Sequence, residues 1–430
     1  MEIIGLNPQI ARSLETVSSK IGIVNAFRKA HLQHSDPNVV AYSATTADAG
    51  VLTDSFKHLA GGAGVTWKDA FLATIGEAVE RYGSSFYDLK RLVKAKASDF
   101  DAADIVAPET YALFADQQYD KEGFPFVRFT ADTELYWDTA VDLVDGRTKY
   151  VPAIFLYMPF RADAKPIAEQ ISTGFAVHSE PERALLSSIF EVIERDAFMI
   201  SWMNLLDLPK IRIDGELKAF ANAIVPPHLD LHLLDMTTDV GIPSVLGIMR
   251  GHHDFGEFIV VCASTRSDYF SAAKKTIIEL CQSVPYFRNL LEMDKDYSDF
   301  SSVRTFVDHS LFYLHRKELW PVFDTWLNAK PTLSISPQPE VEPQVQLKRV
   351  THAFRERGYS ILVKDKTTVD LAQAGFHLVR AVCPGFVHLN GTFGSYYTGG
   401  ERLYNVPVRT GRLSVPKTYE TLNPLPHPFP

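Results

Sequence analysis

A Glu-x-x-Glu-Arg pattern occurs twice in amphipathic segments, and it constrains the fold of this chain more than any other sequence feature. The two copies share the same apolar spacing around them, and they are formed by Glu77, Glu80, Arg81, Glu191, Glu194 and Arg195. Residues three and four apart share a face of an α-helix, so each copy projects its acids and its arginine together. The opposite faces are apolar. We therefore expect two helices that are buried on one side and whose acidic faces are free to line a site.

Local capping signals predict where these two helices begin. Thr66 and Asp69 form a capping box, which predicts a helix from Thr66 through Tyr82. Ser179 and Glu182 form a second box before the other copy. A third helix is expected over about 268–291.

The third predicted helix carries Lys275, Glu279 and Gln282 at spacings of four and then three residues. These side chains also share one face. Three helices could thus contribute polar groups to one cavity.

Strand-like runs separate the helical segments without the regular spacing of βαβ units. They are Val39–Ser43, Val151–Met158, Pro243–Met249, Glu257–Ser264 and Tyr359–Val363. We expect an α+β fold, with a peripheral segment over residues 1–60 and one domain over 61–430. The region Phe306–Val341 is expected to be helical and then interrupted by proline, and the sequence suggests no function for it.

The acidic faces suggest a site for a magnesium nucleotide. Carboxylates bind Mg²⁺, Mg²⁺ bridges phosphates, and a nearby arginine orients the acids or binds phosphate. The chain has no Gly-x-x-x-x-Gly-Lys-Ser/Thr, so a P-loop is excluded. Glycine-containing loops are expected before the two helices, at Gly61–Gly64 and Ser172–Gly174, where backbone amides favour anions. The alternative is that the acids form solvated ion pairs and the glycines form ordinary turns.

Composition limits the kinds of partner and the compartment that we expect for this protein. There are 43 Lys and Arg against 52 Asp and Glu, a formal charge of −9, which argues against nucleic acid. The three cysteines are far apart in the sequence, which argues against a disulfide framework and fits a reducing compartment. The sequence shows no signal peptide, and its apolar run at 197–208 is too short to span a membrane. We expect a cytoplasmic protein with no nucleic-acid or membrane partner.

The C-terminal tail, residues 424–430, has proline at every second position. Proline fixes φ and removes backbone donors, so this tail is expected to be stiff and extended. A stiff tail could place the carboxylate of Pro430 at a fixed point, as a base or as a substrate anchor. The alternative is a docking strap or a ligand for a proline-binding domain.

Together these segments resemble the YcaO family, in its branch of azoline-forming cyclodehydratases. The resemblance covers roughly residues 61–430. It rests on four segments and on the proline-alternating tail: GGAGVTWKDAFLATIGEAVERY (61–82), VPAIFLYMP (151–159), STGFAVHSEPERALLSSIFEVIERDAF (172–198) and RAVCPGFVHLN (380–390).

The resemblance implies ATP and Mg²⁺ as cofactors, held between glutamate-bearing helices that pack on β-sheets. It assigns Mg²⁺ and phosphate binding to Glu77, Glu80, Glu191, Glu194 and Glu279, with Arg81 and Arg195 ordering these acids. It places Ser172, Thr173, Gly174, Lys275 and Gln282 near the nucleotide, and it assigns a catalytic part to the tail through Pro426, Pro428 and Pro430. The chain departs from many family members at Ala63 (lysine), Thr173 (asparagine) and Lys275 (arginine).

The implied reaction is ATP-dependent closure of thiazoline or oxazoline rings at Cys, Ser or Thr of a ribosomal precursor peptide. The implied partners are that peptide, a separate E1-like leader-binding subunit and a flavin-dependent azoline dehydrogenase. A homodimer is also compatible with the sequence. Two alternatives stay open, namely thioamide or amidine formation at the same ATP site and a non-catalytic regulatory subunit.

Overall fold

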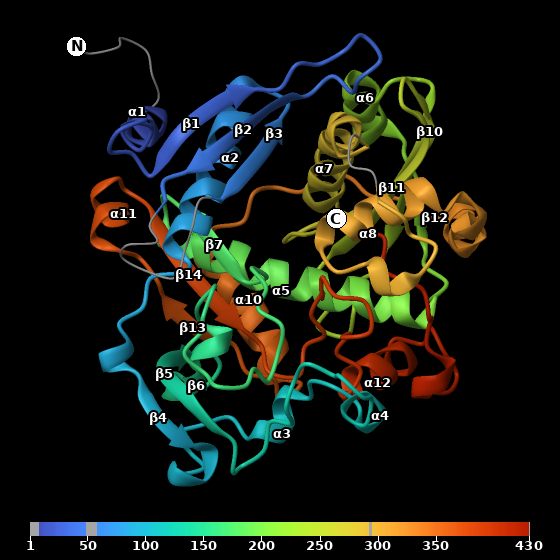
Figure 1. The fold of residues 1–430 in the computed structure, drawn as a ribbon. Coiled ribbons are helices and arrows are strands. Elements are labelled where there is room, and N and C mark those ends of the chain that lie inside the picture. The colour runs from blue at the N-terminus through green and yellow to red at the C-terminus, as the bar shows by residue number, and fades with distance from the viewer. Residues whose placement is uncertain (1–7, 49–57, 292–294, 430) are drawn as a thin grey trace.

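Three β-sheets organise the computed structural model, which describes residues 8–48, 58–291 and 295–429 (Figure 1). The first sheet is antiparallel and has the strand order β1 (Val24–Lys29), β2 (Val40–Thr46), β3 (Leu59–Gly64). The second has the order β4 (Val93–Lys96), β5 (Glu134–Asp142), β13 (Leu362–Asp365), β14 (His377–Val382), β7 (Phe175–His178), with β6 (Thr148–Pro152) also paired to β5. The third has the order β11 (Gly256–Thr265), β10 (Ser244–His253), β9 (Leu229–Asp235), β8 (Lys210–Ile211), β12 (Pro331–Leu333).

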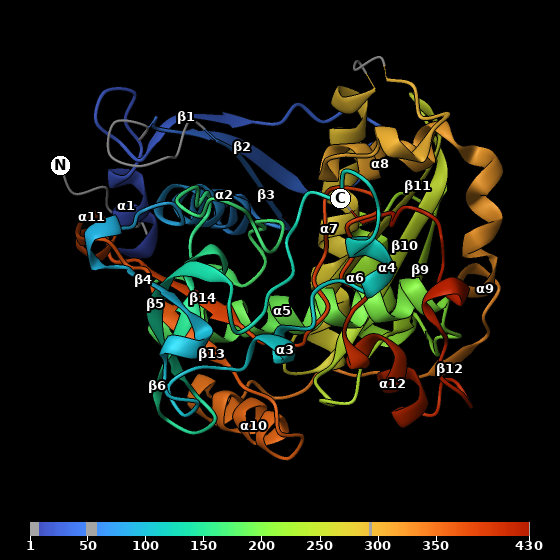
Figure 2. The same cartoon turned by 60° about the horizontal axis from the view of Figure 1, so that its bottom comes forward.

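One long helix packs on each sheet. Helix α2 (Trp67–Gly83) packs on β2 and β3, α5 (Pro181–Asn204) packs on β14 and β7, and α7 (Tyr269–Leu290) packs on β10 and β11. Helix α5 also contacts β11 and crosses the middle of the molecule (Figure 1). In Figure 2 the first sheet and α2 lie at the left of the molecule, and the third sheet and α7 lie at the right.

The remaining helices are shorter and surround this frame. They are α1 (Pro8–Glu15), α3 (Pro108–Tyr111), α4 (Asp116–Tyr119), α6 (Gly215–Ile224), α8 (Phe306–His315), α9 (Asp324–Leu327), α10 (Pro343–Arg355), α11 (Val369–Gln373) and α12 (Glu401–Arg409). Nearly all strand pairs are antiparallel, and only β8 and β12 run parallel among the described strands. The expected α+β class is confirmed.

The three predicted long helices are present, with one error in how they begin. Thr66 caps α2, and its capping box with Asp69 forms as predicted. The N-cap of α5 is Glu180, which makes no side-chain capping bond, so the predicted box at Ser179 is wrong. The Ser179 hydroxyl instead accepts a hydrogen bond from Gln9 at 3.0 Å, a contact 170 residues away in sequence.

The expected glycine loop before α2 is wrong, because Gly61–Gly64 belong to strand β3. Glycine is needed there for close packing. A Cβ on Gly62 would lie 2.5 Å from the backbone nitrogen of Thr74, and one on Gly64 would lie 2.6 Å from the Cβ of Asp69. These glycines let the backbone of β3 lie directly against α2.

The predicted strands are confirmed in the third sheet and displaced in the second. Strands β10 and β11 extend the two predicted runs slightly. The run Val151–Met158 is a strand only to Pro152, and a 3₁₀ turn, Ala153–Phe155, follows because proline cannot donate to a ladder. The run at Tyr359 begins as a strand only at Leu362, since the Tyr359 amide closes the end of α10 on Phe354.

Two predicted regions take defined places in this architecture. Strands β1 and β2 lie in the segment 1–60, and they pair in one sheet with β3, so residues on both sides of the proposed boundary at 60 share this sheet. That boundary stays a prediction.

The region 306–341 contains α8, a 3₁₀ helix, α9 and β12. The apolar run at 197–208 includes the buried second half of α5.

Candidate functional site

The acidic face of α2 is anchored through Glu77. Arg81 lies 3.5 Å from Glu77, and the amide of Gly61 donates to Glu77 Oε2 at 3.3 Å. Glu80 is more enclosed by protein. Burial raises its pKa well above the ordinary value, Arg81 opposes that rise, and the charges of Glu191 and Glu77 add to it.

The acidic face of α5 is held by one backbone donor from the turn before β7 and one from β11. Glu191 Oε2 accepts from the amide of Gly174 at 2.9 Å, and Glu194 Oε2 accepts from the amide of Thr265 at 2.9 Å. Arg195 Nη2 lies 3.5 Å from both carboxylates. These contacts fix the second Glu-x-x-Glu-Arg copy between β7 and β11.

The third helix completes the acidic lining. On α7, Lys275 Nζ lies 3.2 Å from Glu279 Oε1. A Cβ on Gly61 of β3 would lie 3.6 Å from Gln282 Nε2, so this face of α7 reaches the first sheet. Lys275, Glu279 and Gln282 thus lie on the side of α7 that turns toward the other two helices.

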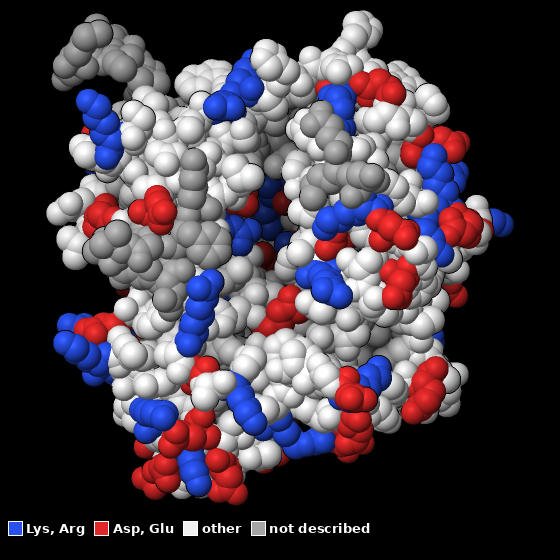
Figure 3. Space-filling model, in the orientation of Figure 1, with Lys and Arg blue, Asp and Glu red and all other residues white. Residues whose placement is uncertain are grey.

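Electrostatic coupling shows that acids from all three helices lie near one another. Glu191 on α5 raises the pKa of Glu80 on α2. Glu194 is buried, and its pKa is raised to about 7 by burial, with Arg195 opposing this and Glu279 on α7 adding to it. Like charges are held together here, which is costly without a bound cation. Figure 3 shows a hollow on this face of the molecule in which acidic and basic side chains meet.

One basic residue of this cluster was missed by the sequence reasoning. Arg380 on β14 is buried, and its charge interacts with Glu191 and Glu80. It donates to the carbonyls of Phe155 at 2.8 Å and Ser172 at 3.1 Å, and burial lowers its pKa to about 10. The available signal was an arginine inside the otherwise apolar strand sequence LVRAV.

The segment Ser172–Gly174 forms a turn that is tied to α5. Gly174 has φ +91°, a conformation that favours glycine. Its carbonyl accepts from the hydroxyl of Ser188 at 2.6 Å, and the carbonyls of Ser172 and Thr173 accept from Arg380. The turn therefore lies beside Glu191, and its contacts to a nucleotide stay a prediction.

The described part of the C-terminal tail runs to this cluster. Pro426, Pro428 and Phe429 are buried, and Pro430 lies outside the described residues. The Phe429 ring centre lies 4.2 Å from the Arg195 guanidinium and 4.7 Å from the Phe198 ring centre. Pro426 and Pro428 are therefore parts of a packed segment that ends beside the second glutamate helix, and their catalytic roles stay predictions.

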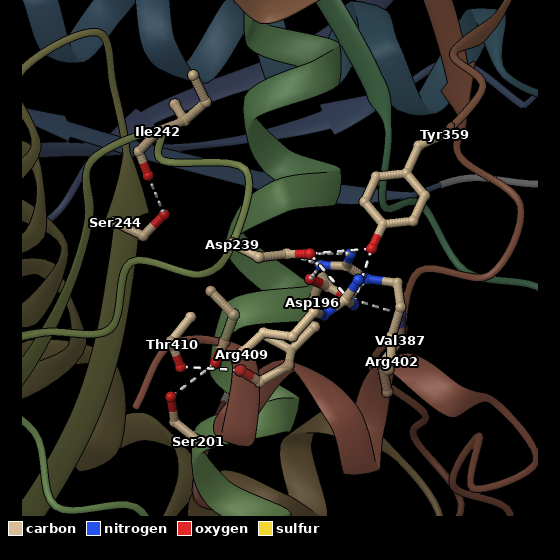
Figure 4. Close-up of polar contacts among 12 residues, drawn as sticks. Asp196, Ser201, Asp239, Ile242, Ser244, Tyr359, Val387, Arg402, Arg409 and Thr410 are labelled. Carbon is tan, nitrogen blue, oxygen red and sulfur yellow. Dashed lines mark hydrogen bonds and ion pairs between the residues drawn. The ribbon is translucent and has the colours of Figure 1, made fainter. Parts of the chain in front are cut away.

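A buried ion network fixes α5 from behind. Asp196 follows Arg195 on α5 and receives two hydrogen bonds from Arg402 on α12, at 3.1 and 2.6 Å. Arg402 also lies 3.0 Å from Asp239, which accepts from the Tyr359 hydroxyl at 2.9 Å (Figure 4). This network holds the helix on the side opposite its glutamates.

The residues present fit a magnesium nucleotide. Arg195 Nε and Nη1 are buried and have no hydrogen-bond partner among the described residues, so two charged donors are available for an anion. Within the described ranges, no three His, Cys, Asp or Glu are close enough to hold one ion together. Mg²⁺ on nucleotide phosphates needs only one or two carboxylates, which the spaced acids supply.

Comparison with known proteins identifies the family of this chain. Residues 61–387 match the family model described as YcaO cyclodehydratase, ATP- and Mg²⁺-binding. The match covers more than half of the chain, so the protein belongs to the YcaO family. The predicted family and the predicted use of ATP and Mg²⁺ are confirmed.

Solved structures share the fold at low sequence identity. A heterocyclase in complex with substrate and cofactor superposes with a TM-score of 0.78 at 22% identity, covering 98% of this chain and 57% of that chain. YcaO from Methanopyrus kandleri, bound with AMPPCP and Mg²⁺, gives 0.61 at 17% identity and 88% coverage of both chains. The E. coli microcin synthetase McbBCD complex gives 0.56 at 15% identity, covering 84% of this chain and 88% of that one.

Two curated relatives match parts of the chain. A protein of Methanothermobacter thermautotrophicus is 25% identical over 56% of this chain and 61% of its own length. A protein encoded in the tfuA 3′ region of Rhizobium leguminosarum bv. trifolii is 32% identical over 26% of this chain and 29% of its own length. The chain thus spans less than two thirds of either relative. Among the described residues, no helix is both long and apolar enough to cross a membrane.

Proposed function

We propose that this protein closes azoline rings in a peptide with the use of ATP. The Cys, Ser or Thr side chain of the substrate attacks the preceding backbone carbonyl. When bound with Mg²⁺, ATP supplies the phosphoryl group that turns the amide oxygen into a leaving group. The nucleophile loses its proton, the amide nitrogen loses its proton, and the oxygen departs as phosphate, which leaves a thiazoline or oxazoline.

One observation carries this choice among the reactions of the family. The proline-alternating tail ends its described course with Phe429 against Arg195, which lies 3.5 Å from Glu191 and Glu194. A tail built in this way supports ring closure, in which a proton acceptor is needed beside the reacting amide. We assign a part in this step to the tail residues Pro426, Pro428 and Pro430.

The side chains of the cluster divide the remaining tasks. One or two acids at a time from the set Glu77, Glu80, Glu191, Glu194 and Glu279 would hold Mg²⁺ on the phosphates. Arg195, Arg380 and Lys275 would bind the phosphate charge that develops during transfer. Glu194 and Arg380 are buried, and charges in such surroundings interact more strongly than they do in water.

The proposed partners are a precursor peptide, a separate E1-like subunit that binds its leader and a flavin-dependent dehydrogenase that oxidises azolines. The acidic cluster is supplied by α2, α5, α7 and β14. The similar E. coli microcin synthetase is a complex, McbBCD, that has been solved with pro-MccB17 bound, which supports a similar assembly here.

The function is tested with the chain, a candidate precursor and a candidate E1-like partner. We expect ADP and phosphate to form in step with loss of one water per ring in the peptide mass. An exchange of oxygen for sulfur would identify thioamidation instead. ATP consumption without any change in peptide mass would reject both reactions.

Deletion of residues 428–430 tests the part played by the tail. We expect ring formation to be lost while the circular dichroism spectrum and the affinity for Mg·ATP are kept. Unchanged turnover in the deletion variant would exclude residues 428–430 from the reaction.

A further inference from the structure

Hydrogen bonds to its backbone hold the C-terminal tail on the end of α5 before the tail reaches the glutamates of that helix. The amide of Asn423 donates to the carbonyl of Met203 at 2.7 Å, and Trp202 Nε1 donates to the carbonyl of Leu425 at 3.3 Å. Both partners lie on α5. The tail therefore starts its buried course along the same helix that carries Glu191 and Glu194.

Helix α8 provides the next two contacts. The hydroxyl of Tyr313 donates to the carbonyl of Pro426 at 2.7 Å, and His309 Nδ1 lies 2.7 Å from the carbonyl of His427. His309 and Tyr313 are four residues apart, so they share one face of α8. Because proline carries no N–H, other residues can hold this tail mainly by hydrogen bonds to its backbone carbonyls.

The centre of the grip is a pair of stacked imidazoles. The rings of His309 and His427 lie 3.6 Å apart and are inclined by only 3°. His309 Nε2 lies 3.1 Å from the carbonyl of Gly391, and His427 Nε2 lies 3.0 Å from the carbonyl of Asn390. The amide of His427 donates to the hydroxyl of Tyr396 at 3.2 Å. The tail is thus joined to α8 and to the loop at 390–396.

These contacts with α8 determine where the last described residues of the tail lie. Two residues after His427, the Phe429 ring lies against Phe198 and Arg195 of α5. Arg195 is 3.5 Å from both Glu191 and Glu194. A tail released at His427 would lose the contact that packs Arg195 against an aromatic face.

We propose that α8 is a clamp for the C-terminal tail and that His309 is a positioning residue, which holds His427 so that Phe429 orders Arg195 in the nucleotide site. This inference rests on the proposed function and assigns a role to the region 306–341. His309 acts through the tail and does not itself touch the acidic cluster.

Hydrogen exchange of the C-terminal peptide tests the clamp without any enzyme assay. His309→Phe keeps an aromatic ring but removes both polar contacts, and Tyr313→Phe removes only the hydroxyl. We expect exchange of the tail amides to become about tenfold faster or more in both variants. His309→Asn keeps a donor near Nδ1 and should restore part of the protection. Unchanged exchange in His309→Phe would overturn the clamp.

Tyr404→Phe is the matched control. The Tyr404 hydroxyl also donates to a backbone carbonyl, that of Thr398, at 2.7 Å, but it does not contact the tail. We expect this variant to leave tail exchange and turnover unchanged. Faster tail exchange in Tyr404→Phe would mean that any lost hydrogen bond loosens the tail, and that result would also overturn the clamp.

The positioning role is tested by turnover once the wild-type complex is active. We expect kcat to fall about tenfold or more in His309→Phe, because a misplacement near 1 Å costs large factors in rate, while KM for ATP changes less than about threefold. His309→Asn should recover part of kcat. Fast tail exchange with unchanged kcat would refute the positioning role, and it would leave the proposed function intact.

Discussion

Substitution of Glu194 by glutamine should stabilise the nucleotide-free protein at alkaline pH. Glu194 is buried on α5, where its carboxylate accepts from the amide of Thr265 at 2.9 Å. The glutamine carbonyl can accept the same hydrogen bond, so the substitution removes the charge and little else. The pKa of Glu194 is raised from 4.5 to about 7, because burial and the charge of Glu279 outweigh the attraction of Arg195.

The magnitude and the sign follow from this pKa. A carboxyl group whose pKa is higher in the folded state holds its proton more tightly there, so its contribution favours folding at low pH and opposes folding as pH rises. The ionised carboxylate of Glu194 therefore costs about 3 kcal/mol of folding free energy at pH 8 and less than about 1 kcal/mol at pH 5. Glutamine carries no such cost at either pH.

Urea unfolding of the nucleotide-free protein at pH 8 and pH 5 measures this difference. We expect Glu194→Gln to raise the urea midpoint at pH 8 and to match the wild type closely at pH 5. Thr265→Ser is a suitable control, because it keeps the amide that Glu194 accepts from. A variant that is less stable than the wild type at pH 8, or equally stabilised at both pH values, would refute the reasoning.

Three further predictions concern the frame around the site. Gly62→Ala should destabilise the fold by about 1–3 kcal/mol, because its Cβ would meet the backbone of α2, whereas Gly76→Ala, with no atom within 4 Å, should stabilise it by about 0.5–1 kcal/mol. Burial lowers the pKa of His309 from 6.5 to about 4. The free energy of unfolding of the wild type should therefore fall as pH drops below 6.5, by about 2 kcal/mol at pH 5. His309→Phe should not show this fall. Arg402→Met should cost about 3–5 kcal/mol, because it leaves the Asp196 charge buried without its arginine. Urea midpoints measure all of these changes.

Each of these predictions has a result that contradicts it. Equal midpoints for Gly62→Ala and Gly76→Ala would mean that β3 has room for a side chain. Parallel pH dependence in wild type and His309→Phe would mean that this imidazole titrates normally in the folded state. A loss below about 1 kcal/mol in Arg402→Met would mean that the network behind α5 contributes little.

The sequence was most informative about the long helices. The spacing of acids and apolar residues predicted α2, α5 and α7, because a helical face is set by residues within one or two turns. The capping box at Thr66 was correct for the same reason. At Ser179 the local pattern failed, because the hydroxyl is used by Gln9 from a distant part of the chain.

The parts that depend on tertiary contacts could not be derived from local patterns. Gly61–Gly64 look like a loop by composition, and their place in β3 is explained only by the close approach of α2. Arg380 belongs to the cluster because β14 lies beside β7, a pairing between residues some 200 positions apart in sequence. The course of the tail likewise depends on His309, whose significance no local pattern indicates.

The central claim, that helices α2, α5 and α7 hold a magnesium nucleotide between them, is tested most directly by calorimetric titration with ATP. We predict binding only when Mg²⁺ is present, with a dissociation constant between about 1 μM and 1 mM, the usual range for substrates. Glu191→Gln should weaken this binding about tenfold or more, because it removes a carboxylate whose charge acts on Glu80 of α2 across the site. Binding that is independent of Mg²⁺, or that is unchanged in Glu191→Gln, would contradict the account.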